Sequence, residues 1–318
     1  MAVKKRFAKR FWGMGTAGLV CLLAVSTTGC SSADPGSAGN AGERTAPLTK
    51  SEDLHLPIEK YLFSNAETVR LEKGRFALIG KCLRRLGLGH GIESPGPAPG
   101  PRNVMERRYG ISDLGEAKVN GYRLGDTGTP PPRSLAAQLD SLSGAEKTQL
   151  TSALHGEADP ASAGQGGLRV NGVPVPVGGC AGEATGRIAG GTTGHTGPSE
   201  VARRTNFESF DASRSDARVV RALGSWSRCM KEKGYAYPDP LAAMSDPAFQ
   251  GKSPTPKERD VAQADIRCKR STNLIGIWFD VEAALQKSMI EKKGPDFSAA
   301  LKAKNGQLAR AASALGDR

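Results

Sequence analysis

Cysteine is the residue type whose number and spacing say most about the chemistry of this chain. Of the six cysteines in the 318 residues, Cys21 and Cys30 lie near the amino terminus, and the others are Cys82, Cys180, Cys229 and Cys268. No two of these four are close in sequence and the histidines are equally scattered, so the close pairs typical of a metal site are missing. An even number of separated cysteines predicts two disulfides if the chain is exported, as its amino terminus indicates below, with a metal site as the alternative.

The other reactive residues form no known catalytic motif. The sequence has no G-x-S-x-G, H-E-x-x-H, C-x-x-C or EF-hand pattern. Asp260 and Asp265, near Cys268, are a conceivable carboxylate pair, but solvation on a helix surface or pairing with Arg259 or Arg267 is the simpler interpretation. We expect no cofactor and no metal, and favour a protein that is not an enzyme.

Three aromatic residues have the right chemistry to stack on a sugar or a partner. Trp226 lies three residues before Cys229 on the same predicted helix face, which favours a place in the core. Tyr235 and Tyr237, in the segment GYAYPDP, are the better candidates for contact with a ligand or partner.

Two similar helical segments are expected to position two of the cysteines. Residues 64–88 and 211–235 have apolar residues six and three positions before the cysteine and a glycine five positions after it. Ser64 and Glu67 form an S-x-x-E capping box, Asp211 is the N-cap candidate of the second copy, and each glycine favours a left-handed helix end. The agreement suggests an internal duplication. The alternative is that two unrelated amphipathic helices follow the same sequence preferences.

The strongest helix signal covers residues 255–294. It begins with the capping box TPKE, ends at KKGP, and carries one apolar stripe over about 38 residues, with a bend expected near residues 273–276. Cys268 lies in this stripe as Cys229 lies in its own, so we expect Cys229–Cys268 to join two packed helices. By elimination Cys82 pairs with Cys180.

The remaining segments are mostly irregular. Two Pro-rich stretches precede a short capped helix at 143–156, and Asn171-Gly172 indicates a small β-hairpin. We expect a mainly α protein of two related disulfide-stapled helical modules, residues 57–196 and 205–318, with long Gly/Pro-rich loops. Residues 295–318 have apolar residues at helical spacing, suited to folding back on the long helix or to contacting a partner.

The amino terminus has the pattern of an export signal. Five basic residues in the first ten precede a short apolar stretch, roughly 13–25, which is shorter than the about 20 residues of a membrane-spanning helix. The sequence then changes at Gly29-Cys30 to Ser, Asp, Pro and Gly. This junction resembles the lipobox of bacterial lipoproteins, although Thr27 stands where that class favours Leu. The resemblance implies a signal peptide over 1–29 and lipid attachment at Cys30, with the export route left open.

Composition agrees with a tethered exported protein. Residues 30–56 are poor in apolar side chains and predict a flexible tether. High Gly and Pro content favours an actinomycete source, and the net charge of +12 falls to +7 once the five basic signal residues are removed. The positive charge could bind anionic lipid or an anionic cell-wall polymer. The simpler interpretation is that it only keeps the protein soluble. Nucleic acid is not expected as a partner.

Four further segments carry a family resemblance. They are residues 226–243 (WSRCMKEKGYAYPDPLAA), 263–286, 107–122 and 173–184. Together they resemble a group of secreted lipoproteins of streptomycetes and related actinomycetes. The resemblance implies export, a tethered mainly helical body and two cysteine pairs, and it transfers no activity. We expect an accessory on the outer face of the cytoplasmic membrane that binds a transporter, another envelope protein or a cell-wall component. A cell-wall hydrolase and a solute-binding lipoprotein are the alternatives.

Overall fold

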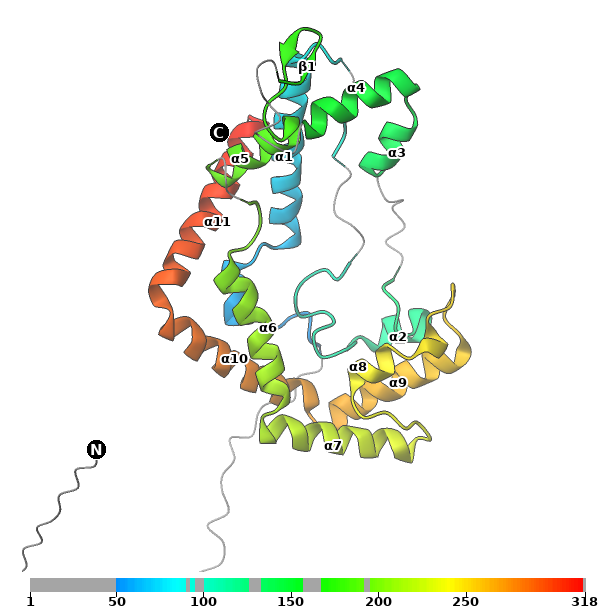
Figure 1. Cartoon of the computed structure of the whole chain (residues 1–318). Helices are drawn as coiled ribbons and strands as arrows, with labels where there is room; N and C mark the ends of the chain where they lie inside the picture. The colour runs from blue at the N-terminus through cyan, green and yellow to red at the C-terminus, as the bar shows by residue number, and fades with distance from the viewer. Residues whose placement is uncertain are drawn as a thin grey trace, which may run out of the picture. The chain divides into compact units, whose positions relative to one another are not determined.

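The protein is described by a computed structural model over residues 50–89, 92–94, 100–125, 133–156, 167–191 and 195–316. The chain divides into two units, Met1–Glu43 and Arg44–Arg318, and all described elements belong to the second (Figure 1). The mainly α prediction is confirmed. The elements are, in order, η1 (Pro57–Tyr61), α1 (Asn65–Arg85), α2 (Leu114–Asn120), α3 (Leu135–Asp140), α4 (Gly144–His155), β1 (Arg169–Val170), β2 (Val173–Pro174), α5 (Gly179–Ala189), α6 (Glu200–Arg214), α7 (Ala217–Glu232), α8 (Pro240–Met244), η3 (Pro247–Phe249), α9 (Pro256–Ser271), α10 (Leu274–Lys292) and α11 (Gly294–Leu315).

Helix ends follow the local sequence closely. The capping boxes expected at Ser64, Ser143 and Thr255 are all formed, each pairing the hydroxyl with a glutamate three residues on. Gly87 and Gly234 adopt φ of 73° and 85° after α1 and α7, the left-handed conformation that ends a helix without a steric penalty. These short-range signals fix where α1, α4 and α9 begin and where α1 and α7 end.

Two predicted local features have the expected geometry. β1 and β2 pair antiparallel with Val170 opposite Val173, and the turn residues Asn171 and Gly172 have φ of 52° and 77°. The bend expected in the long helix is a break: α9 has 16 residues, α10 has 19, and Asn273 between them has φ of 49°. Asparagine tolerates this left-handed conformation better than most residues, so the chain changes direction there.

The helix predicted to begin at Asp211 begins later, and this prediction was wrong. Asp211 lies inside α6, and α7 starts after Asp216, whose carboxylate accepts a hydrogen bond from the backbone N–H of Arg218. α6 was not predicted because its buried face consists of small, mostly polar residues and so lacks the apolar spacing of an amphipathic helix. The residues of that face are Ala202, Thr205, Ser209 and Ser213.

The hydrophobic core joins segments that the sequence assigned to different modules. The main cluster combines residues 56–62 and 105–122 with residues from α6 to α11, whereas a second cluster gathers α1, α4 and α5. Ser51 and Leu56, placed in the expected tether, are buried at 0% and 2% exposure. The end of that segment therefore belongs to the folded body, because Leu56 packs in the main cluster.

α1 packs against both α5 and α11, and α5 and α11 also contact each other (Figure 1). Gly74 on α1 makes the closest approach, since a Cβ there would lie 2.8 Å from the Cα, Cβ and carbonyl oxygen of Ala311. α11 therefore packs mainly on α1, not on α10. The absence of a side chain at residue 74 sets how close the two helices come.

We expect Gly74→Ala to destabilise the protein by about 1–3 kcal/mol, because the added methyl group forces α1 away from the α11 backbone. Gly80→Ala on the same helix is the matched control. Its Cβ would meet only Arg84 Nη1 at 3.4 Å, so the better helix propensity of alanine adds about 0.5–1 kcal/mol. Urea unfolding measures both; equal effects of the two substitutions would contradict the close packing.

Candidate functional site

Both disulfides are present with the expected pairing. Cys82 on α1 is bonded to Cys180 on α5 with a Cα–Cα distance of 5.6 Å, and Cys229 on α7 is bonded to Cys268 on α9 with 5.7 Å. Cys82, Cys180 and Cys268 are buried, whereas Cys229 is half-buried at the surface. The second disulfide therefore has one cysteine near the surface, whereas both cysteines of the first are enclosed.

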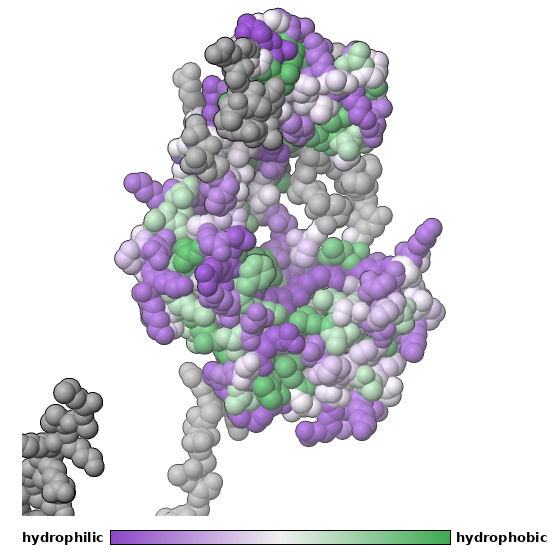
Figure 2. Space-filling view, viewed as in Figure 1, coloured by the Kyte–Doolittle hydropathy of each residue, from purple (hydrophilic) through white to green (hydrophobic). Residues whose placement is uncertain are grey.

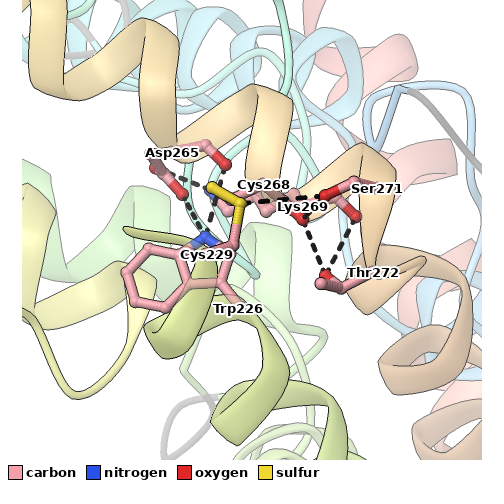
Figure 3. Close-up of a disulfide and its surroundings, with 7 residues drawn as sticks. All are labelled: Trp226, Cys229, Asp265, Cys268, Lys269, Ser271 and Thr272. Atoms are coloured by element: carbon pink, nitrogen blue, oxygen red, sulfur yellow. Dashed lines mark hydrogen bonds and ion pairs between the residues drawn. A yellow bond between two sulfur atoms is a disulfide. The ribbon is translucent and has the colours of Figure 1, made fainter. Parts of the chain in front are cut away.

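A buried ion pair lies beside the Cys229–Cys268 disulfide (Figure 3). Lys269 Nζ lies 2.9 Å from Asp265 Oδ2, one helical turn away on α9, and both side chains are fully buried. Trp226 of α7 donates from its indole Nε1 to Asp265 Oδ1 at 2.9 Å, and Lys269 donates to the backbone oxygen of Ile111 at 2.8 Å. The pair thus ties α7, α9 and the 109–111 segment together.

The surroundings of this pair explain how two charged groups fit in the core. Gly110 has φ of 80°, and a Cβ there would come within 2.5 Å of Lys269 Nζ, so glycine leaves the space that the ammonium occupies. Burial raises the pKa of Asp265 and lowers the pKa of Lys269. The charge of each partner acts in the opposite direction and favours the ionised pair.

A second buried carboxylate, Glu282 on α10, is the centre of a larger network. Arg108 donates from Nε to both of its oxygens, at 3.0 and 2.9 Å. The other donors to Glu282 are the hydroxyls of Tyr109 at 2.8 Å and Ser209 at 3.0 Å and the amide nitrogen of Gln286 at 3.2 Å. These donors occupy both oxygens of a fully buried side chain, so its role is to hold α6, α10 and residues 108–109 together.

The tyrosine-bearing segment after α7 is partly packed against the core. Tyr235 and Tyr237 are both half-buried and contact the main cluster. The Tyr237 hydroxyl donates to Asp246 Oδ2 at 2.6 Å, and Ser227 Oγ donates to the Tyr237 backbone oxygen at 2.7 Å. Burial and this carboxylate raise the pKa of Tyr237. The segment is held in one conformation, with Ala236 exposed between the two tyrosines.

The candidate carboxylate pair of α9 is not assembled into a site. Asp265 is enclosed in the ion pair with Lys269, whereas Asp260 is exposed on the same helix. Of the histidines in the described part, His55 is hydrogen-bonded to Glu59, and His155 and His195 lie exposed on other segments. Within these residues no group of three His, Cys, Asp or Glu side chains is placed to hold a metal ion.

The described clefts are small. One of about 290 Å³ lies between η1, the start of α1, residues 102–104 and Lys304 of α11, and others of about 240 and 220 Å³ lie near α3 and beside α1. A polar hollow of about 40 Å³ is lined by Arg102, Arg107 and Arg123 and by the carboxylates Glu52, Glu106, Asp113 and Glu116. None of these four contains Tyr235, Tyr237, Asp260 or Asp265.

Sequence reasoning missed the buried polar residues as a group. Asp265 with Lys269 and Glu282 with Gln286 are each four residues apart inside the apolar stripe of the long helix, so each pair faces one side of it. The signal that could have revealed them is a pair of polar residues four apart at core positions of an amphipathic helix. The partners Arg108, Tyr109 and Ile111 come from an irregular segment and carry no comparable signal.

The predicted lipid site lies outside the described residues, which begin at Lys50, and so do the signal peptide and most of the tether. Among the helices that are described, none is both long enough and apolar enough to cross a membrane. Comparisons with protein-family models, curated proteins and solved structures found no match to this chain.

Proposed function

We propose that this protein is an exported accessory of the bacterial envelope, anchored by lipid at Cys30 to the outer face of the cytoplasmic membrane. It binds a membrane transporter, another envelope protein or a cell-wall component and does not catalyse a reaction. The observation that carries the proposal is that the buried charged groups serve to join helices. Asp265, Lys269 and Glu282 are engaged in contacts that join helices, which leaves the outer surface of a rigid body as the functional part.

The four described clefts lie at or below the lower end of the usual size range of small-molecule sites, which gives solute capture little support. Sites for small molecules usually have volumes of about 300–1,000 Å³, and the four clefts described above reach at most about 290 Å³. The separation of Asp260 from Asp265 removes the support that a wall hydrolase had from these residues. The two disulfides agree with an oxidising compartment outside the cytoplasm.

The exposed surface suits a partner that binds through mixed polar and apolar contacts. On the face drawn in Figure 2, hydrophobic side chains form small areas between hydrophilic ones. Interfaces between proteins that also exist separately have a similar mixed character. The segment with Tyr235 and Tyr237 is a suitable contact because tyrosine contributes a large area and a polar tip, and its conformation is already fixed by Asp246 and Ser227.

Cys30→Ala tests the anchoring part of the proposal. Without the acyl chains the exported body has no lipid inserted in the bilayer, so we expect it to move into the culture medium or to leave the membrane fraction in a high-salt wash. Cell fractionation followed by immunoblotting measures the distribution. Cys21→Ala is the matched control and is expected to stay at the membrane. Retention of the Cys30→Ala protein at the membrane after the high-salt wash would contradict a lipid anchor at this residue.

A further inference from the structure

The outer face of α7 is a row of basic side chains on a firmly held helix. Val219, Ala222, Trp226 and Met230 turn into the core, and the Cys229–Cys268 disulfide fixes the helix to α9. The opposite face is exposed and carries Arg221, Arg228 and Lys231. In Figure 1, α7 lies at the lower edge of the fold with α9 above it, so this face points away from the body.

These three cations form no ion pair with a carboxylate of the described residues, although Glu232 is exposed next to Lys231 at the end of α7. In the described part of the chain, Arg218 forms an ion pair with Asp216, but Arg221, Arg228 and Lys231 form none. The adjacent helix α6 differs, since its Arg203 and Arg204 are paired with Glu200 and Glu208. α7 therefore keeps a net positive face, which disfavours the isolated fold slightly through repulsion between like charges.

The arrangement suits a flat anionic surface better than a single anion. At about 100° per residue the three side chains fall within an arc of about 80°, and they extend over about 15 Å along the helix. Gly224 and Ser225 between them are small and exposed, and Val220 beside them is 52% exposed. Nothing bulky on α7 therefore separates the charges from a surface that approaches this face.

We propose that the α7 face formed by Arg221, Arg228 and Lys231 binds the anionic phospholipid headgroups of the membrane. The inference rests on the proposed function, because the lipid anchor brings the body to that surface. The 19 residues between Cys30 and Lys50 would span about 25 Å on average as a flexible chain, so the anchor holds the folded body close to the bilayer. Contact through α7 then fixes which side of the body faces outward to a partner.

Vesicle binding tests the inference without the lipid anchor. The mature chain of residues 30–318 with Cys30→Ser, which carries no acyl chain and keeps every described element and both disulfides, is mixed with vesicles of phosphatidylcholine containing phosphatidylglycerol. We expect binding to these vesicles, loss of binding at high salt, and none to pure phosphatidylcholine. The combined variant R221Q/R228Q/K231Q is expected to bind about 100-fold more weakly.

The matched control removes the same charge elsewhere. K287Q/K292Q/K302Q changes three exposed lysines of α10 and α11 that form no ion pair in the described part, and we expect binding within about threefold of the wild type. Circular dichroism and disulfide mapping check that both variants are folded. Equal loss in both variants, binding to neutral vesicles alone, or binding to purified anionic wall polymer without binding to vesicles would overturn the inference. The Cys30→Ala experiment reports on the anchor separately, since these vesicles hold no acylated protein.

Discussion

Replacing Asp265 by alanine is expected to lower the free energy of unfolding by about 3–5 kcal/mol, because it leaves the Lys269 ammonium buried without its counter-charge. The Ile111 backbone oxygen remains as a partner for Lys269, but an uncharged acceptor does not replace a carboxylate. The indole N–H of Trp226 also loses its acceptor at 2.9 Å and keeps only the longer contact of 3.3 Å to the Asp265 backbone oxygen. Guanidinium unfolding followed by circular dichroism measures the loss.

Two further variants distinguish the contribution of the ion pair to stability from that of α9 as a whole. Asp260→Ala, at an exposed position of α9, is expected to change stability by about 0.5 kcal/mol at most. The double variant D265A/K269M removes both charges and is expected to recover part of the loss, since no buried charge is left alone. A double variant that is less stable than D265A would show that Lys269 contributes by something other than its pairing with Asp265.

Mild reduction by a small hydrophilic thiol is expected to break Cys229–Cys268 well before Cys82–Cys180. The attacking thiolate must reach a sulfur atom, and Cys229 is half-buried whereas Cys82 is only 2% exposed and Cys180 0%. Loss of this link, which spans 39 residues, is expected to lower stability by about 4 kcal/mol on chain-entropy grounds. Iodoacetamide labelling with mass spectrometry gives the order of reduction.

The two cysteine pairs serve as controls for each other in the same sample. We expect the label first on Cys229 and Cys268, with Cys82 and Cys180 labelled only once denaturant is added. Simultaneous labelling of all four cysteines under native conditions would mean that reduction requires global unfolding and would contradict the accessibility of Cys229.

Local and short-range features were predictable from the sequence. The Ser64, Ser143 and Thr255 caps, the glycine ends of α1 and α7 and the Asn171-Gly172 turn depend on a few adjacent residues, so their signals survive in any fold. The cysteine pairing was predictable for a related reason. Cys229 and Cys268 lie on the apolar faces of two helices, and only four cysteines remained to be paired.

Long-range organisation was not predictable in the same way. α6 presents Thr205, Ser209 and Ser213 to the core, a face without apolar periodicity, and its polar groups are satisfied by Glu282, Gln286 and Trp278 from a distant helix. Likewise, residues 105–111 join the main core through contacts with α9 and α10 that no local pattern reveals. The sharing of one core between two expected modules follows from these distant contacts.

Site-specific crosslinking in intact cells tests most directly whether the protein binds an envelope partner as proposed. A photo-crosslinking amino acid is placed at the exposed Ala236 between the two tyrosines, with Lys302 on α11 as the control position, and products are identified by mass spectrometry. We expect position 236 to capture a permease, another envelope protein or a wall component that position 302 does not. If position 236 yields no product above that control while the protein is present at the membrane, the account of a partner-binding accessory acting through this segment is wrong.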